Sequence, residues 1–182
     1  YQIHLSAGEA EVGFVASQVA LSADGSTIIF SDTTEGTRQL WIKERGVADA
    51  RPIPGTLGGW APFFSPDGRT VAYTSGSQVL RIPLTGGTAR VLSDSALVGE
   101  RPVRGAWLDD GTLIYPGPGL QGRALFRISA DGGASTLVLE DKALAGYGVG
   151  IPYGLPGARG VLFTVCTSVC VGMSLHVLDL RN

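Results

Sequence analysis

Residues 64–73 read FSPDGRTVAY, a turn signal followed directly by an apolar run. In an Asp-Gly turn the Asp side chain accepts a hydrogen bond from the backbone N–H two residues further on. Glycine then adopts the positive φ that other residues resist. A short run rich in Thr, Val and Tyr after such a turn is typical of a β-strand. The segment therefore predicts a β-hairpin around Asp67-Gly68.

The same signal occurs twice more, at Asp24-Gly25 and Asp110-Gly111, 43 residues before and 43 residues after Asp67-Gly68. Each copy is followed by an apolar run that begins with threonine, at Thr27 and Thr112. A period in the low forties with strand-like runs between turns is the signature of a β-propeller blade. The sequence predicts an all-β propeller of four-stranded antiparallel blades.

Four such units account for nearly all of the 182 residues. We expect one propeller domain over residues 1–182, with blades at about 14–56, 57–99, 100–145 and 146–182. The fourth unit is degenerate, because Pro156-Gly157-Ala158 stands where Pro66-Asp67-Gly68 stands in the second. We expect these blades to be part of a larger propeller. The alternative is a four-bladed ring in which residues 1–6 supply a closing strand to the last blade.

Composition excludes two classes of partner. The net charge is −2, and the 14 Lys and Arg residues are spread along the chain, so no basic stripe predicts binding to nucleic acid. No apolar run approaches the roughly 20 residues of a membrane span, so we expect no membrane insertion in this segment.

Neither a metal site nor a catalytic site is predicted. Each of the three repeated aspartates belongs to the turn of its own blade, which favours a structural role over a ring of metal-binding carboxylates. His4 and His176 have no cysteine or carboxylate at ligand spacing, so we expect no metal and no cofactor. A Gly-x-Ser-x-Gly motif is absent from the sequence, and we expect this segment not to be an enzyme. Four carboxylates remain candidates for a glycosidase-like catalytic pair, namely Glu100, Asp109, Glu140 and Asp141.

The two cysteines, Cys166 and Cys170, form a single Cys-x-x-x-Cys pair. We place the pair in a loop after a strand at residues 161–165, where a local disulfide is sterically feasible. A disulfide and two free thiols both remain open, because the compartment is not fixed by the sequence.

Candidate binding residues follow from the strand order. If the Asp-Gly and Gly-Gly turns lie on one rim, the opposite rim gathers the longest segments, which are residues 33–35, 58–60, 100–104, 116–122, 147–153 and 166–172. Binding residues concentrate on such loops, and aromatic and Arg side chains are enriched among interface anchors. The candidates are Trp60, Arg101, Arg104, Tyr147 and Tyr153. The alternative is that Trp60 and the tyrosines fill the central channel.

Two longer segments carry a resemblance to a known family. Residues 63–73, FFSPDGRTVAY, with LRIPLTGG at 80–87, resemble the TolB-like, WD-related propeller repeat. Residues 51–56 (RPIPGT) running into 62–64 (PFF), with RGAW at 104–107 and VLFTVC at 161–166, resemble the propeller that lies carboxy-terminal to bacterial Hanks-type serine/threonine protein kinase domains. The resemblance covers almost the whole chain.

The resemblance implies a bacterial signal-transduction module, a non-catalytic sensor that binds a protein or a small ligand outside the cytoplasmic membrane, in the periplasm or its equivalent. The kinase's own chemistry is not implied, because the sequence has no His-Arg-Asp loop, Asp-Phe-Gly or glycine-rich phosphate loop. Two alternatives share the repeat: the propeller of a periplasmic Tol-system protein, and the gating propeller of a prolyl-peptidase-like hydrolase. The ligand is not identified, and further blades of the same propeller are a candidate partner.

Overall fold

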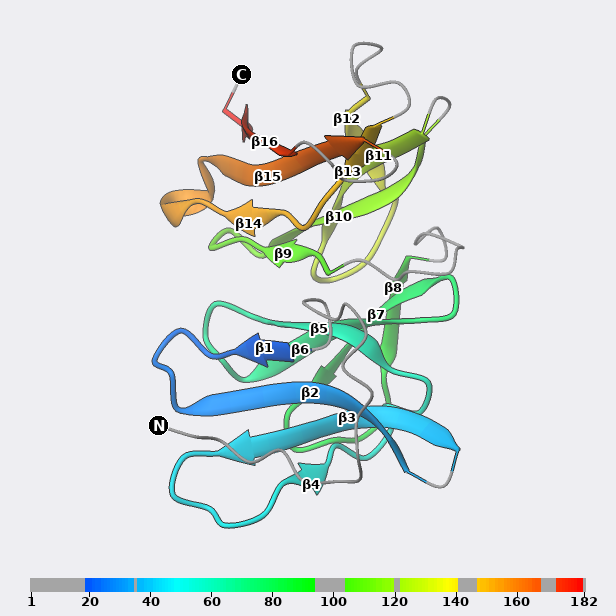
Figure 1. The fold of residues 1–182 in the computed structure, drawn as a ribbon, viewed down its shortest axis with the longest axis vertical. Helices are drawn as coiled ribbons and strands as arrows, with labels where there is room; N and C mark the ends of the chain where they lie inside the picture. Colours follow the sequence, from blue (N-terminus) through cyan, green and yellow to red (C-terminus); the bar gives the residue numbers. More distant parts are fainter. Residues whose placement is uncertain are drawn as a thin grey trace.

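The computed structural model describes residues 19–34, 36–93, 104–119, 122–140, 147–167 and 173–181, which form four antiparallel sheets (Figure 1). Blade 1 has the spatial order β1 (Val19–Leu21), β2 (Thr27–Thr34), β3 (Thr37–Glu44) and β4 (Arg51–Pro52). Blade 2 follows with β5 (Trp60–Phe64), β6 (Thr70–Ser75), β7 (Gln78–Pro83) and β8 (Arg90–Ser93). Blade 3 repeats the order with β9 (Ala106–Trp107), β10 (Thr112–Gly119), β11 (Gly122–Ser129) and β12 (Thr136–Leu139).

Blade 4 departs from this order. Its inner strand is in two pieces, β13 (Tyr147–Val149) and β14 (Tyr153–Gly154), which both pair with β15 (Gly160–Thr167). β15 also pairs with β16 (Met173–Asp179), and no described residue pairs with the far edge of β16. Blades 1 and 2 occupy the lower half of Figure 1 and blades 3 and 4 the upper half. The predicted all-β propeller of antiparallel four-stranded blades is confirmed.

The alternation of side chains along each strand gives every blade two faces. We call the face toward the next blade in the sequence the forward face, and the other the backward face. In β10, Ile114 packs forward onto blade 4, whereas Leu113 and Tyr115 pack backward onto blade 2. Successive side chains of a strand point to opposite faces of a sheet, so an unbroken apolar run is what a strand buried on both faces requires.

Three apolar clusters fill the three interfaces between successive blades. The first joins blades 1 and 2 and includes Leu40 and Tyr73; the second joins blades 2 and 3; the third joins blades 3 and 4 and includes Leu125 and Phe163. Full burial of a large aliphatic or aromatic side chain is worth about 1.5–3 kcal/mol. The clusters therefore supply the main stabilisation of this arc of blades.

The Asp-Gly turns are held by their own side chains. The carboxylate of Asp67 accepts the backbone N–H of Arg69 at 3.0 Å and the hydroxyl of Ser65 at 2.6 Å. Asp24 does the same with Ser26 and Ser22, and these hydrogen bonds, the Ser22 hydroxyl first, lower its pKa to about 2. The predicted structural role of these turns is confirmed.

The turn of blade 4 keeps the positive φ of one position without the aspartate. Pro156–Ala158 form a short 3-10 helix in which Gly157 has a φ of 71° and Ala158 a φ of 52°. Ala158 thus occupies the position that Gly68 fills in blade 2, with a φ of 67°. The Gly157 N–H donates to the carboxylate of Asp109 in the adjacent turn of blade 3 at 2.7 Å.

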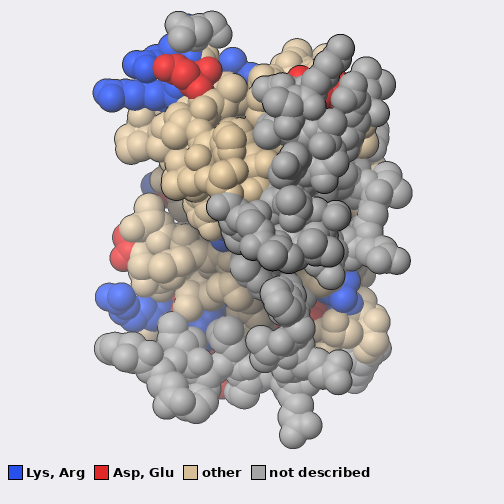
Figure 2. All heavy atoms as spheres, turned by 45° about the horizontal axis from the view of Figure 1, so that its top comes forward, with Lys and Arg blue, Asp and Glu red and all other residues tan. Residues whose placement is uncertain are grey.

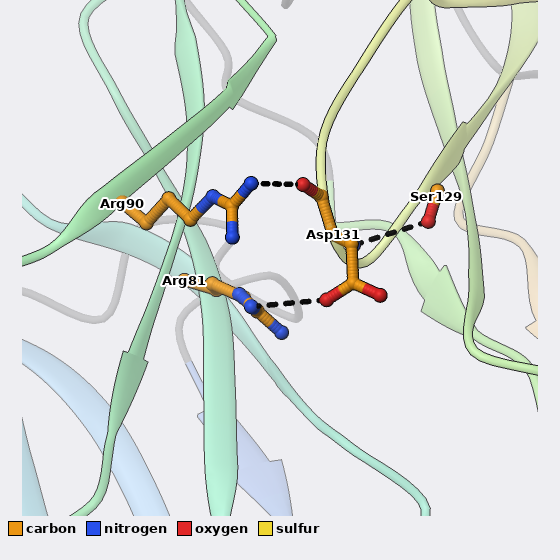
Figure 3. A network of polar contacts seen from close by, with 4 residues as sticks. All are labelled: Arg81, Arg90, Ser129 and Asp131. Carbon is orange, nitrogen blue, oxygen red and sulfur yellow. Dashed lines mark hydrogen bonds and ion pairs between the residues drawn. The ribbon is translucent and has the colours of Figure 1, made fainter.

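All these turns lie on one rim, which we call the Asp-Gly rim. The Arg45 guanidinium, in the β3–β4 turn, donates to the Gly25 carbonyl at 3.3 Å. On the same rim, Asp131 of blade 3 joins two arginines of blade 2 (Figure 3). Its carboxylate pairs with Arg81 at 3.2 Å, and its backbone carbonyl accepts a hydrogen bond from Arg90. These two polar contacts cover the interface between blades 2 and 3 at the Asp-Gly rim.

The described ranges contain no helix long and apolar enough to cross a membrane. The closing strand that we expect at residues 1–6 lies outside the described residues.

Candidate functional site

Arg104 lies just before β9, among the inner strands of the propeller. Its Nη1 donates a hydrogen bond to the backbone carbonyl of Val19 in β1 at 2.9 Å. The centre of its guanidinium lies 5.6 Å from the centre of the Tyr153 ring, in β14. One side chain therefore links the inner strands of blades 1, 3 and 4.

The polar environment of this guanidinium is incomplete. Its Nε is buried and has no hydrogen-bond partner, and within the described residues no carboxylate lies at ion-pair distance from Arg104. A buried donor without a partner costs about 1–3 kcal/mol. An anionic or hydrogen-bond-accepting group that reached this position would recover that free energy. The neighbouring Tyr153 is half exposed and offers a flat aromatic surface.

Trp60 forms a separate contact at the start of β5. The guanidinium of Arg38, from β3 of blade 1, lies 3.8 Å from the centre of the Trp60 ring, which is within the range of a cation–π interaction. The Trp60 carbonyl accepts a hydrogen bond from the Thr74 hydroxyl at 3.4 Å. Trp60 thus has a partner on the neighbouring blade, and the structure gives no contact between it and Arg104.

The remaining candidates are described in part or not at all. Arg101 lies outside the described residues, and of Tyr147 the structure describes the backbone, in β13, but not the side chain. Of the five predicted residues, the structure brings Arg104 and Tyr153 together and places Trp60 in a different contact.

Tyr153 does not lie on the opposite-rim loop where it was predicted. Residues 147–154 form the inner strand of blade 4, and Tyr153 pairs with Leu162 next to the turn on the Asp-Gly rim. The strand is interrupted because Pro152 has no N–H, while Gly150 packs so closely on Thr164 that a Cβ would lie 2.2 Å from its hydroxyl.

A second predicted loop is also a strand, because β10 continues to Gly119 and β11 begins at Gly122. Gly117 makes this extension feasible, since a Cβ there would lie 2.5 Å from the ring of Phe126. The predicted position of Cys166 in a loop is wrong as well. Cys166 lies within β15 and pairs with Gly148 and Met173, whereas Cys170 lies outside the described residues.

Other polar residues act locally. His176 stacks on Phe163 and shares a hydrogen bond of 2.7 Å with Ser174. Of the carboxylates left open by the sequence, Asp109 accepts from Gly157, and Glu100 and Asp141 lie outside the described ranges. Within those ranges no three His, Cys, Asp or Glu side chains group as a metal site would require.

Two features were missed by sequence reasoning. Arg38 was not singled out, since an arginine in a strand gives no sign of which ring it will meet. The hydroxyl of Tyr115 joins Ser93 of blade 2, at 2.9 Å, to Ser135 of blade 3, at 2.7 Å. These serines are 42 residues apart, close to the repeat period, which is the one signal that relates them.

Comparison with known proteins shows the fold. No family model matches the chain, and no curated protein matches it. Solved structures do. The putative TolB from Agrobacterium tumefaciens is similar with a TM-score of 0.67 at 19% identity, over 90% of this chain and 58% of that chain. TolB from Acinetobacter baumannii is similar with a TM-score of 0.54 at 14% identity, over 90% and 43%.

Dipeptidyl peptidase 4 from Porphyromonas gingivalis is similar with a TM-score of 0.55 at 13% identity, over 87% of this chain and 30% of that chain. In all three cases the chain spans less than two thirds of the protein that it matches. At these identities the similarity shows a TolB-like propeller fold and nothing about ligand or reaction.

Proposed function

We propose that this chain is a non-catalytic propeller module that binds a protein or a small ligand through an anionic group placed against Arg104 and Tyr153. The single observation that carries the proposal is the buried, unpartnered Nε of Arg104 among the inner strands. A guanidinium presents several N–H donors in a fixed plane that matches a carboxylate or phosphate. The half-exposed ring of Tyr153, 5.6 Å away, supplies the apolar contact beside it.

The wider context that we propose is the extracytoplasmic sensor region of a bacterial serine/threonine protein kinase. The support for it is the resemblance of residues 51–56, 104–107 and 161–166 to kinase-associated propellers. In that arrangement a ligand bound at Arg104 acts outside the membrane and the catalytic lobes lie elsewhere in the protein.

Two alternatives are favoured by particular neighbours. Similarity to TolB supports a periplasmic Tol-type module, and similarity to dipeptidyl peptidase 4 supports the propeller of a peptidase. Sequencing the flanking reading frame separates the three. Kinase catalytic motifs upstream support our proposal, a Gly-x-Ser-x-Gly hydrolase domain downstream supports the peptidase context, and an export signal without either domain supports the Tol-type context.

Binding itself is tested with paired peptides. Short peptides with a free terminal carboxylate, and the same peptides amidated, are titrated into the wild-type protein while its Tm is followed. A ligand at 100 times its Kd stabilises the folded state by about 2.7 kcal/mol, so a specific carboxylate raises the Tm by several degrees. We expect Arg104→Gln to lose this response.

The matched control is Arg45→Gln, which removes an exposed arginine that also donates to a backbone carbonyl, but on the Asp-Gly rim. It should keep the wild-type response. Equal shifts with free and amidated peptides, no shift with any peptide, or an unaltered response in Arg104→Gln would each contradict the proposed site.

A further inference from the structure

One register position can be compared in all four blades. Ser31 pairs with Leu40 in blade 1, Thr74 with Val79 in blade 2, Pro116 with Leu125 in blade 3 and Thr164 with Leu175 in blade 4. Each of these aliphatic residues lies on the forward face of its third strand, since Leu40, Val79 and Leu125 pack in the cluster shared with the next blade.

Exposure separates blade 4 from the other three. Leu40, Val79 and Leu125 are each 0% exposed, whereas Leu175 is 66% exposed. Its neighbour on the same face of β16, Val177, is exposed too, at 62%. Leu175 and Val177 lie two residues apart on one strand and form a continuous exposed strip.

Figure 2 brings the top of Figure 1 forward, where blades 3 and 4 lie, and shows an area of residues other than Lys, Arg, Asp and Glu next to a cluster of charged side chains. An exposed apolar patch on a soluble domain marks an interaction surface. Here it lies on the face that buries an interface in every preceding blade.

The residues that cover the forward faces of blades 1 to 3 indicate what would cover the forward face of blade 4. An aromatic residue from the backward face of the next blade packs in each cluster: Tyr73 with Leu40, Tyr115 with Val79, and Phe163 with Leu125. We propose that the forward face of blade 4 binds the backward face of a fifth blade, supplied by the same polypeptide. The solved propellers agree with this source, since this four-bladed arc spans 58% of one TolB chain and 43% of another.

The proposal is tested in the natural gene product with two matched substitutions. Leu125→Ala removes a leucine that blade 4 covers, and Leu175→Ala removes the leucine at the same register position one blade later. If a fifth blade covers Leu175, both variants leave a cavity of the same kind. We expect both to lower the Tm by about 5–15 °C, measured by circular dichroism, with the protein monomeric by light scattering.

Three results would overturn the proposal. The first is a Tm drop in Leu125→Ala without one in Leu175→Ala, which would mean that the face is uncovered. The second is a wild-type dimer that Leu175→Lys dissociates, which would identify a second copy as the occupant. The third is a gene product that ends too close to Asn182 to hold another blade of about 40 residues.

Discussion

Blades 2 and 4 have the same backbone plan and differ in how completely they are covered. Blade 2 has four strands, an aspartate in its turn and an apolar cluster on each face. Blade 4 has a divided inner strand, no aspartate in its turn and, within the described residues, one cluster, which it shares with blade 3. The difference shows that the strands of blade 4 pair although its turn has no aspartate and, within the described residues, its forward face shares no cluster.

The two blades also show which features of the repeat are replaceable. Ala158 accepts a positive φ where blades 1 to 3 have glycine, and the Gly157 N–H finds Asp109 of the neighbouring blade instead of a carboxylate of its own turn. Glycine at a positive φ and a capped turn lower the free energy of the hairpin, but β14 and β15 pair without a glycine at the position of Ala158 and without a carboxylate in the turn itself.

The largest expected difference between the blades is in the core. Ile82 of blade 2 and Leu178 of blade 4 occupy the same register position, opposite Val71 and Val161. Ile82 is fully buried, so Ile82→Ala should lower the free energy of unfolding by about 2–5 kcal/mol. Leu178 is partly buried, and Leu178→Ala should cost less than half as much. Urea unfolding monitored by tryptophan fluorescence measures the free energy of unfolding of both variants. Equal decreases would contradict the conclusion that this position is less buried in blade 4 than in blade 2.

A smaller effect is expected from exchanging the turn residues. Gly68 has a φ of 67°, and a Cβ added to it would meet no atom within 4 Å, so Gly68→Ala introduces backbone strain alone. We expect it to lower stability by about 1 kcal/mol, and Ala158→Gly to raise stability by a similar amount. Differential scanning calorimetry should show Tm changes of opposite sign. Changes of the same sign would mean that the two turns are not equivalent.

The smallest expected effect is in the acid range. Hydrogen bonds hold the pKa of Asp24 at about 2, below its ordinary value of 3.8, and lower the pKa of Asp67 as well. A depressed folded-state pKa adds stability above the unfolded pKa and loses it as the pH falls through the folded value. Stability should therefore fall between about pH 4 and pH 2, and less steeply in Asp24→Asn.

The control for the acid series is Asp49→Asn, at an exposed position in the β3–β4 turn. It should follow the wild-type curve of Tm against pH from about pH 5 to pH 2. If Asp24→Asn also follows that curve, the turn hydrogen bonds do not stabilise the charged carboxylate in solution. The turn of blade 4 has no carboxylate at this place. Blade 4 contributes to the slope from another position, because hydrogen bonds from Arg181 lower the pKa of Asp179 to about 2.

Most of the fold was predictable because each turn and strand of the repeat is indicated by residues that are close together in the sequence. The strand beginning at Thr70 was expected from its turn and its apolar run, and β6 begins at that residue. The errors fall where proline and glycine interrupt such runs, at residues 116–122 and 147–153. Those residues usually indicate loops, and here cross-strand partners keep the backbone extended on either side.

The site was predictable only in residue type. Arginine and tyrosine were expected as anchors, but the 5.6 Å approach of Arg104 to Tyr153 depends on how blade 3 is oriented to blade 4. The same holds for Arg38 and Trp60, which come from different blades. Nothing in the sequence near these residues gives that orientation, because it results from the packing of the clusters between blades.

The amino-acid sequence on its own determined the repeat, the turn positions and the alternating faces of each strand, because those depend on residues within a few positions of one another. The tertiary structure decided which faces are covered, which arginine has a buried Nε without a hydrogen-bond partner and which leucine is exposed. Those properties depend on contacts between units about 43 residues apart, and Leu125 and Leu175 look alike until the blade beside each of them is known.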